Sequence, residues 1–469
     1  MREFDLNIER VLENWTVAHA IRELIANALD EAALTGTAEP RTEKDADGRW
    51  RIRDFGRGLR YEHLTQNENT EKLANPDKVV GKFGVGLKDA LATFDRRAVR
   101  VEIRSRHGVI GTARRGKHGF EDLHTLHALI GPAIDPAMSG TDVVLEGVRD
   151  EDVEEAKSLF LHYAGEAVLE STTFGQVIAR RGRTPARIYV NGLRVAEEKN
   201  YLFSYNVTSP TKALRAALNR ERTNVGRTAY TDRMKAILLA ARSDAVASSL
   251  AEDLSKFQAG IWHDEVQLVD IGVHACQVLN ASGRVIFLTP AELSSARDFV
   301  DRAANDGYRV VVVPDNIRRK LRDAVDIEGN PIVDLGRFRQ QWNESFTFTF
   351  VAPEDLAPDE RAVFERTDEI LALRGGRPAI VKEILVSETM RLGASDFAES
   401  QGVWEGRDGR IVVKRSELRS LETYAGTLLH ELAHAISGTR DISAEFENVL
   451  TDELGGLAAA AIGPTATDS

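Results

Sequence analysis

The sequence of 469 residues predicts an α/β protein built from several domains. Apolar residues at helical spacing recur in the segment 20–33, AIRELIANALDEAA, which indicates an amphipathic helix with one buried face. The segment 284–314 has the pattern of a strand, a helix and a strand, which is typical of a βαβ unit. Short alternating apolar runs, which are typical of strands, occur at 99–104, 109–113 and 141–145.

Composition excludes several classes of protein. The chain has 61 basic and 73 acidic residues, and this net charge of -12 argues against a protein that coats nucleic acid non-specifically. It does not exclude a local basic patch that contacts nucleic acid, although no motif indicates one. Cys276 is the single cysteine, so no intrachain disulfide and no four-cysteine zinc site can form. The charged segment 1–15 does not resemble a signal peptide, and no apolar run is long enough to span a membrane. We therefore expect a cytoplasmic protein.

The helix predicted at 20–33 carries a row of polar residues beside its apolar face. Glu23, Asn27 and Asp30 are spaced by four and three residues, so their side chains leave the helix on one side. Such a carboxylate can accept a proton from water, and the Asn27 side-chain oxygen can bind Mg²⁺. On a helix considered alone, a solvated edge would be the better interpretation of this row.

Glycine-containing motifs follow this helix. Asp54, Gly56 and Gly58 come directly after a short strand, in the sequence IRDFGRGL. The segment 81–88, GKFGVGLK, lets backbone amides approach an anion, and the apolar run after it predicts a helix whose amino terminus faces phosphate. The segment 139–141, SGT, leads into another strand.

These motifs, in this order and at these separations, resemble the ATPases of the gyrase, histidine kinase, MutL and chaperone superfamily. The resemblance covers about residues 1–150 and implies the Bergerat ATPase fold, an α/β sandwich that binds ATP and Mg²⁺. It implies that Glu23 is the general base for the attacking water and that Asn27 is the Mg²⁺ ligand. The implied ATP-binding residues are Asp54, Gly56 and Gly58 at the adenine, Gly81, Lys82, Gly84 and Gly86 at the phosphates, and Thr141 beside the base.

The same region also contains a predicted loop, a candidate lid and an amino-terminal segment to which we assign no catalytic residue. The polar segment 35–47 is predicted to be a surface loop, and the segment 67–79 is a candidate for a lid over ATP. The resemblance also implies that the first 13 residues exchange between two protomers, so we expect a homodimer through the ATPase domain.

A second region, 151–255, contains a helix at 152–161 and a hairpin around Asn191-Gly192. Its basic cluster of Arg215, Arg220, Arg222 and Arg227 would suit either a solvated face or a phosphate contact. The sequence LNRER resembles the arginine loop of the chaperone branch, which implies an arginine on the γ-phosphate. We prefer Arg222 to Arg220 for this role.

The second chemical motif is HELAH at 430–434. His430 and His434 lie four residues apart, so on a helix both imidazoles leave one face and can share a metal ion. Glu431 would stand beside them to activate a metal-bound water. Zn²⁺ is the metal that such a set of ligands favours.

The residues around HELAH, a hairpin at 403–414 and a helix at 421–436, resemble the zincin metallopeptidases. A new helix is expected to begin near Asp441 and to supply a third ligand. Glu447 is the first choice, with Thr451 as its hydrogen-bonding partner, followed by Glu445 and then Asp441. The metzincin pattern is not met, because no histidine stands at the required offset after Gly438.

The sequence thus predicts four domains: an ATP-binding domain at 1–150, a transducer-like α/β domain at 151–255, an α/β connecting module at 256–353 and an α+β zincin-like domain at 354–469. The expected function is an ATP-regulated zinc metallopeptidase whose protein substrate the sequence does not identify. The alternative is a chaperone-like or MORC-like ATPase that remodels nucleic acid and keeps the zincin part as a scaffold. A histidine kinase is disfavoured because no phosphoacceptor helix is evident.

Overall fold

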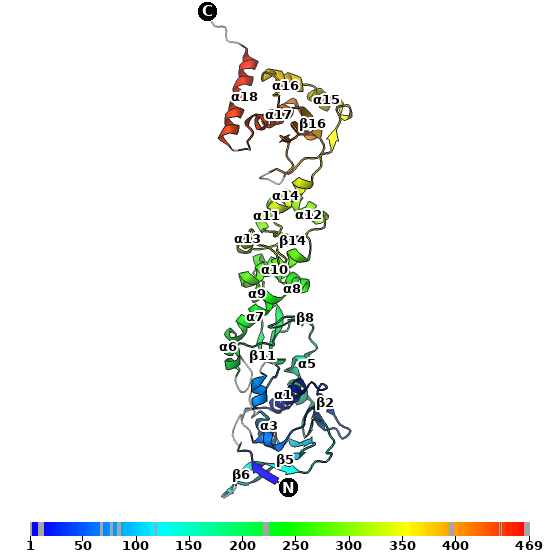
Figure 1. Ribbon diagram of the computed structural model, residues 1–469, viewed down its shortest axis with the longest axis vertical. Helices are drawn as coiled ribbons and strands as arrows, with labels where there is room; N and C mark the ends of the chain where they lie inside the picture. Colours follow the sequence, from blue (N-terminus) through cyan, green and yellow to red (C-terminus); the bar gives the residue numbers. More distant parts are fainter. Residues whose placement is uncertain are drawn as a thin grey trace, which may run out of the picture. The chain divides into compact units, whose positions relative to one another are not determined.

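A computed structural model of the chain shows a mixed α/β protein with several sheets, as predicted. Two compact units divide the chain, Met1–Ser282 and Gly283–Ser469 (Figure 1). Among the residues that the structure describes, no helix is long and apolar enough to cross a membrane. The described residues are 2–7, 14–65, 69–75, 78–81, 86–117, 120–218, 225–393, 398–439, 441 and 443–463.

A seven-stranded sheet, in which all neighbours are antiparallel, organises the first part of the first unit. In spatial order its strands are β1 (Arg2–Asp5), β6 (Phe120–Gly131), β5 (Gly108–Lys117), β4 (Arg100–Ser105), β7 (Thr141–Glu146), β3 (Trp50–Arg53) and β2 (Arg41–Lys44). The strands predicted at 99–104, 109–113 and 141–145 are confirmed as β4, β5 and β7.

The prediction of a loop at 35–47 was wrong for the residues that form β2. This strand pairs with β3 at the edge of the sheet, and its residues Arg41, Glu43 and Lys44 are exposed. A charged edge strand has no buried face to produce alternating hydrophobicity, so its sequence reads as a loop.

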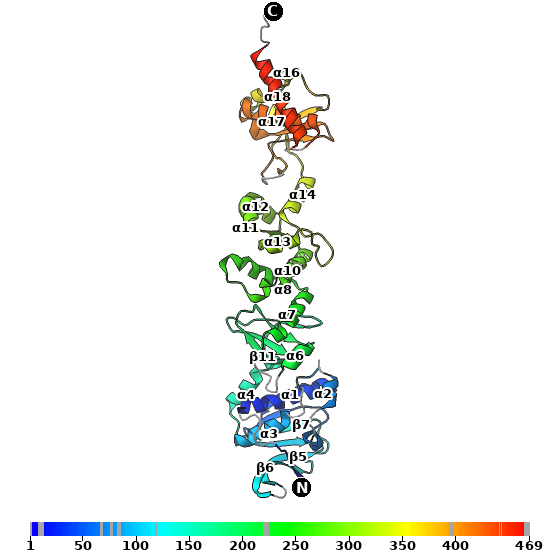
Figure 2. The ribbon, with the colours of Figure 1, turned by 90° about the vertical axis from the view of Figure 1, so that its left-hand side faces the viewer.

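The predicted central helix is confirmed as α1 (Val17–Thr35). Thr16 caps its amino terminus by accepting a hydrogen bond from the His19 N–H, and Gly36 ends the helix in the left-handed conformation, with φ of 66°. Ile21, Leu24 and Ile25 are buried in the core between α1, the sheet and α3 (Gly86–Arg96). Figures 1 and 2 both show α1 and α3 beside the strands of this sheet.

Short elements connect β3 to α3 on the side of the polar residues of α1. These are a 3₁₀ turn at Tyr61–Leu64 and the five-residue helix α2 (Thr70–Ala74), which Asn69 caps by accepting a hydrogen bond from the Lys72 N–H at 3.1 Å. α2 therefore lies within the segment 67–79 that the sequence marks as a lid candidate.

A five-stranded mixed sheet follows, in the order β11 (Leu193–Glu198), β10 (Ala186–Val190), β12 (Phe203–Val207), β9 (Gly175–Ala179) and β8 (Val168–Ser171). The hairpin predicted at Asn191-Gly192 is confirmed between β10 and β11, and both turn residues have positive φ, 47° and 82°. The helices of this part are α4 (Asp150–Ser158), α5 (Leu161–Ala164), α6 (Lys212–Ala217), α7 (Thr228–Ala240), α8 (Asp244–Leu254), α9 (Asp264–Gln267) and α10 (Val269–Ser282).

The second unit begins with the predicted βαβ unit. β13 (Val285–Leu288) and β14 (Arg309–Val312) are parallel neighbours, which confirms the pattern read from the sequence. The connecting segment is broken at Ala296 into α11 (Pro290–Ser295) and α12 (Arg297–Asn305). α13 (Asp315–Leu321) and α14 (Leu335–Ser345) follow.

A four-stranded sheet and a long helix complete the second unit. The strands lie in the order β15 (Phe350–Val351), β16 (Glu383–Ser387), β18 (Arg410–Lys414) and β17 (Gly402–Glu405), so β17 is an edge strand. β17 and β18 form the predicted hairpin, and α17 (Leu421–Ser437) is the predicted helix with the HELAH motif. The remaining helices are α15 (Pro358–Phe364), α16 (Thr367–Leu373) and α18 (Ala444–Ile462).

Candidate functional sites

A cavity of about 400 Å³ opens between α1, α2 and the strands β3, β4 and β7. This volume lies within the range of small-molecule sites. Both apolar and polar side chains line it, so it suits a ligand that has an apolar ring and a charged group. The lining residues include Leu24, Ala28, Ile52, Ile103 and Val143 among the apolar ones, and Asn27, Glu31, Asp54, Lys72 and Thr141 among the polar ones.

Asp54 lies in the wall of this cavity and is 6% exposed. Its Oδ1 accepts hydrogen bonds from the backbone N–H of Gly56 at 2.9 Å and of Thr141 at 3.2 Å. Burial raises the pKa of Asp54 above its ordinary value, and these donors oppose that rise. The Thr141 hydroxyl accepts a hydrogen bond from the Leu59 N–H, so it fixes the backbone beside Asp54.

Glycine is required where the segments carrying Asp54 and Thr141 cross. Gly140 has a φ of +75°, and a Cβ at this position would lie 2.0 Å from the backbone oxygen of Asp54. Gly58 likewise has a positive φ, +85°. These glycines let two loops approach each other at the cavity.

The polar row of α1 divides between the cavity and the core. Asn27 lines the cavity, whereas Asp30 is 1% exposed and accepts hydrogen bonds from the N–H groups of Val80 and of Gly81, the latter at 2.8 Å. Asp30 thus holds the start of the glycine segment against α1. Lys82 and Gly84 lie outside the described residues.

Glu23 is 5% exposed and does not belong to the residues that line the cavity. Its Oε1 accepts a hydrogen bond from the buried guanidinium of Arg22 at 2.9 Å. Its Oε2 lies beside Gly86, the first residue of α3, where an added Cβ would come within 2.3 Å. Glu23 is therefore next to the helix amino terminus that the sequence assigns to phosphate.

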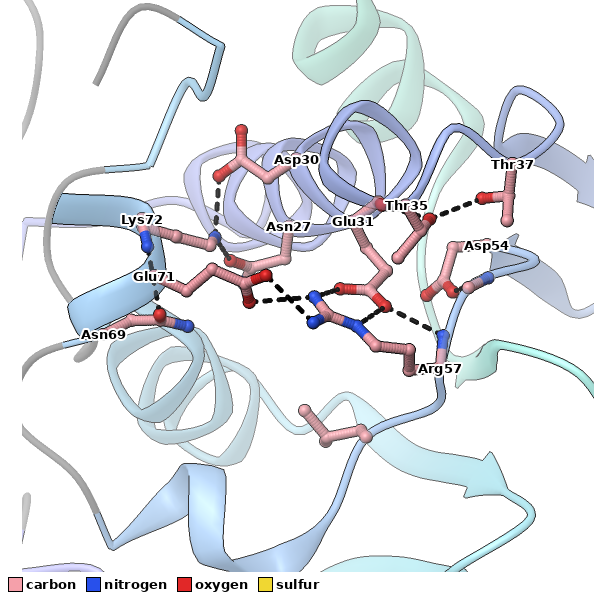
Figure 3. A network of polar contacts seen from close by, with 12 residues as sticks. Asn27, Asp30, Glu31, Thr35, Thr37, Asp54, Arg57, Asn69, Glu71 and Lys72 are labelled. Carbon is pink, nitrogen blue, oxygen red and sulfur yellow. Dashed lines mark hydrogen bonds and ion pairs between the residues drawn. The ribbon is translucent and has the colours of Figure 1, made fainter. Parts of the chain in front are cut away.

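Glu31 and Arg57 line the same cavity and were not predicted from the sequence. Arg57 binds both carboxylate oxygens of Glu31 at 2.9 Å and also binds Glu71 of α2 at 3.0 Å (Figure 3). Although burial raises it, Arg57 holds the pKa of Glu31 below its ordinary value. Glu31 stands four residues after Asn27, so the helical spacing alone could have indicated that it faces the cavity.

The second candidate site lies in the second unit, where His430, His434 and Asp441 meet. Asp441 Oδ1 is 3.2 Å from His430 Nε2 and 3.1 Å from His434 Nε2. One ligand atom from each of the three residues lies within 4.8 Å of the others. The other ring nitrogen of His434 contacts the Thr439 carbonyl at 2.9 Å, which orients the imidazole toward Asp441.

The structure does not bring Glu447, the predicted third ligand, into this cluster. α18 begins at Ala444 behind the cap Ser443, so Asp441 precedes the helix, and Glu445 and Glu447 are exposed. The α18 residue that faces the histidines is Phe446, whose ring lies 4.4 Å from that of His434 and 5.1 Å from that of His430. Among the three alternatives, the geometry thus favours Asp441, the last choice from sequence.

Glu431 is 6% exposed, and its side chain extends from α17 to β17. Burial raises its pKa to about 7, whereas the charge of His434 and a hydrogen bond from the Trp404 N–H lower it. A Cβ at Gly402 would lie 2.7 Å from Glu431 Cγ, so the strand passes directly over this side chain. A buried carboxyl with a pKa near neutrality can both accept and release a proton.

Arg220 and Arg222, the candidates for the γ-phosphate contact, lie outside the described residues. Arg227 is described, and it forms an ion pair with Asp264, while its guanidinium lies over the ring of Tyr201 at 4.8 Å. Arg227 therefore anchors the start of α7 to neighbouring residues of the same unit.

Comparisons with known proteins place the chain in a family. An uncharacterized protein of Mycoplasma pneumoniae strain M129 is 37% identical over 242 residues, which cover 51% of this chain and 97% of that protein. A second uncharacterized protein of that strain is 22% identical over 352 residues, covering 69% of this chain and 96% of the relative. The family described as the Mycoplasma pneumoniae MPN635 N-terminal domain matches residues 151–244, which contain the five-stranded sheet. The chain belongs to the same family as the first of these Mycoplasma proteins.

Proposed function

We propose that the protein is an ATP-regulated zinc metallopeptidase. The observation that carries the proposal is the convergence of His430, His434 and Asp441, with Glu431 buried on the same helix as the two histidines. Two imidazoles and one carboxylate leave a fourth position of a tetrahedral zinc site for water or substrate. The proposed class is the zincin metallopeptidase, in an α+β domain that includes the sheet β15–β18 and α17.

Two of the three spacings between the donor atoms suit zinc. Ligands at about 2.0–2.1 Å from a tetrahedral zinc lie about 3.3 Å from one another. The two distances from Asp441 Oδ1 to the imidazoles, 3.2 and 3.1 Å, are close to this value. Bound zinc would supply a water of lowered pKa and polarise the carbonyl of a peptide bond.

Residues of the chain itself would handle the proton and the peptide. Glu431 would take a proton from the attacking water and return it to the leaving amine. The Trp404 N–H donates to Glu431, so the open edge of β17 faces the HELAH helix. A substrate in extended conformation would add to this edge as a further strand, with its scissile bond beside Glu431.

ATP would bind in the cavity of the first unit, in an α/β sandwich of the gyrase, histidine kinase, MutL and chaperone type. Asp54 would accept a hydrogen bond from the adenine amino group, and Asn27 would hold Mg²⁺ at the phosphates. Glu23, next to the amino terminus of α3, would accept the proton of the attacking water. In this proposal Arg222 contacts the γ-phosphate, and ATP controls a cytoplasmic homodimer.

The test is hydrolysis of a peptide library by the whole protein, measured with no nucleotide, with ATP and with a non-hydrolysable ATP analogue. We expect cleavage that depends on nucleotide and is lost in Glu431→Gln, which keeps the three zinc ligands. Glu23→Gln should bind ATP without hydrolysing it, so its peptidase activity with ATP should equal that of the ATP-bound wild type. Cleavage that is the same in all nucleotide conditions and in Glu23→Gln would reject the regulation, and no cleavage in any condition would reject the peptidase.

The alternative, a chaperone-like or MORC-like ATPase with a scaffold zincin domain, differs in one outcome. It predicts that Glu431→Gln keeps the biological activity of the protein.

A further inference from the structure

The ammonium group of Lys72 in α2 lies at the residue that would hold Mg²⁺. Its Nζ donates to Asn27 Oδ1 at 3.0 Å and forms an ion pair with Asp30 Oδ2 at 2.6 Å (Figure 3). The Lys72 side chain is 12% exposed and that of Asp30 is 0% exposed. The positively charged side chain of Lys72 thus contacts the polar row of α1, and Lys72 is one of the residues that line the cavity.

Mg²⁺ and this ammonium group compete for the same oxygen. Asn27 offers a single side-chain oxygen, and Mg²⁺ binds such an oxygen at about 2.0–2.1 Å in octahedral geometry. An ammonium group 3.0 Å from that oxygen takes one of its two acceptor directions and puts a positive charge beside the other. The two cations also repel each other at such a separation in a partly desolvated cavity.

α2 has a second connection to the cavity that does not involve Asn27. Arg57 binds Glu71 of α2 on one side and Glu31 of α1 on the other. Lys72 can therefore leave Asn27 while Glu71 still keeps α2 near the cavity. The ion pair with Asp30 gives Lys72 a partner that it can retain after the exchange.

We infer that Lys72 takes the place of the divalent cation at Asn27 in the nucleotide-free protein and leaves Asn27 when that oxygen binds Mg²⁺ together with ATP. This inference rests on the proposed ATP site. Lys72 also puts a positive charge near the phosphates when metal is absent. In the absence of Mg²⁺, ATP should therefore bind more tightly to the wild type than to a variant without this lysine. The increase in ATP affinity that Mg²⁺ brings should accordingly be smaller in the wild type than in that variant.

The experiment measures the dissociation constant of the non-hydrolysable analogue adenylyl imidodiphosphate by calorimetry, once in excess EDTA and once in excess Mg²⁺. The ratio of the two constants is the Mg²⁺ enhancement. We expect this enhancement to be about tenfold larger in Lys72→Met than in the wild type, since the variant removes the competing cation. Lys44→Met is the matched control, because Lys44 is also ion-paired, to Asp150, but does not line the cavity.

Lys72→Met leaves the Asp30 carboxylate without its ion pair and can harm folding. The double variant Asp30→Asn/Lys72→Met removes both charges and should show the same increase in enhancement. An enhancement equal to that of the wild type in both variants, with nucleotide binding intact, would overturn the role of Lys72 and leave the ATP site standing. Absence of nucleotide binding by the wild type would instead overturn the ATP site, and with it this inference.

Discussion

Gly402 of β17 packs directly on the side chain of Glu431 in α17. A Cβ at residue 402 would lie 2.7 Å from Glu431 Cγ and 3.0 Å from its Oε1. The same Cβ would lie 2.7 Å from Thr427 Cγ2, so a larger residue would have to move either the strand or both side chains of α17. The glycine thus sets the distance between the edge strand and the proposed general base.

Gly402→Ala should therefore lower peptidase activity while leaving the metal site intact. We expect kcat/KM to fall at least about tenfold, because small displacements of a catalytic group are costly, and zinc content to stay the same. Gly426→Ala is the control, since Gly426 lies on the same helix with no atom within 4 Å of an added Cβ. Equal loss of activity in both variants would indicate a general effect on α17 and contradict the specific role of Gly402.

Zinc content distinguishes the alternatives for the third ligand. His430→Ala and Asp441→Ala should each lose the zinc that elemental analysis finds in the wild type, because both residues belong to the cluster. Glu447→Ala should retain it, since Glu447 is exposed and outside the cluster. The reverse result, with zinc lost from Glu447→Ala and kept in Asp441→Ala, would restore the assignment made from the sequence.

The elements that carry their own periodicity were predictable. α1, α17 and the hairpin at Asn191-Gly192 follow from local spacing and turn chemistry, and the structure has all three. The spacing of His430 and His434 also sufficed to place both imidazoles on one face of a helix.

Features that depend on the exact start of a helix or on contacts between distant segments were not predicted. The choice between Asp441 and Glu447 depends on where α18 begins, and the Ser443 cap starts the helix after Asp441. The ion pair of Glu31 with Arg57 joins residues 26 positions apart in sequence, so no local pattern indicates it. β2 is stabilised by pairing with β3 and not by a buried face.

Glu360 provides a prediction of pH dependence in the second unit. Hydrogen bonds from Arg415 hold the pKa of Glu360 below its ordinary value of 4.5, and Glu360 also accepts the Ala357 N–H at the start of α15. A carboxyl whose pKa is lower in the folded state stabilises the fold above the unfolded-state pKa and loses that effect as pH falls through the folded-state value.

Glu360→Gln should therefore lower the melting temperature at pH 7, and the difference from the wild type should shrink as pH falls below about 4.5. Thermal unfolding of the whole protein across this range, followed by circular dichroism, measures the effect. Glu365→Gln is the control, because Glu365 is exposed at the carboxyl-terminal cap of the same helix. A difference between Glu360→Gln and the wild type that does not change with pH would contradict an ionic contribution.

Asp54→Asn tests the proposed adenine contact. In the wild type, Asp54 Oδ1 accepts hydrogen bonds from the Gly56 and Thr141 amides. The side-chain oxygen of asparagine can accept the same two hydrogen bonds, so we expect the fold to be retained. Its NH₂ group would face the adenine amino group, which would leave two donors opposed in a buried position. The dissociation constant for ATP should therefore rise about a hundredfold, measured by calorimetry. Asp47→Asn, in the turn between β2 and β3, should bind ATP as the wild type does, and unchanged affinity in Asp54→Asn would remove Asp54 from the adenine site.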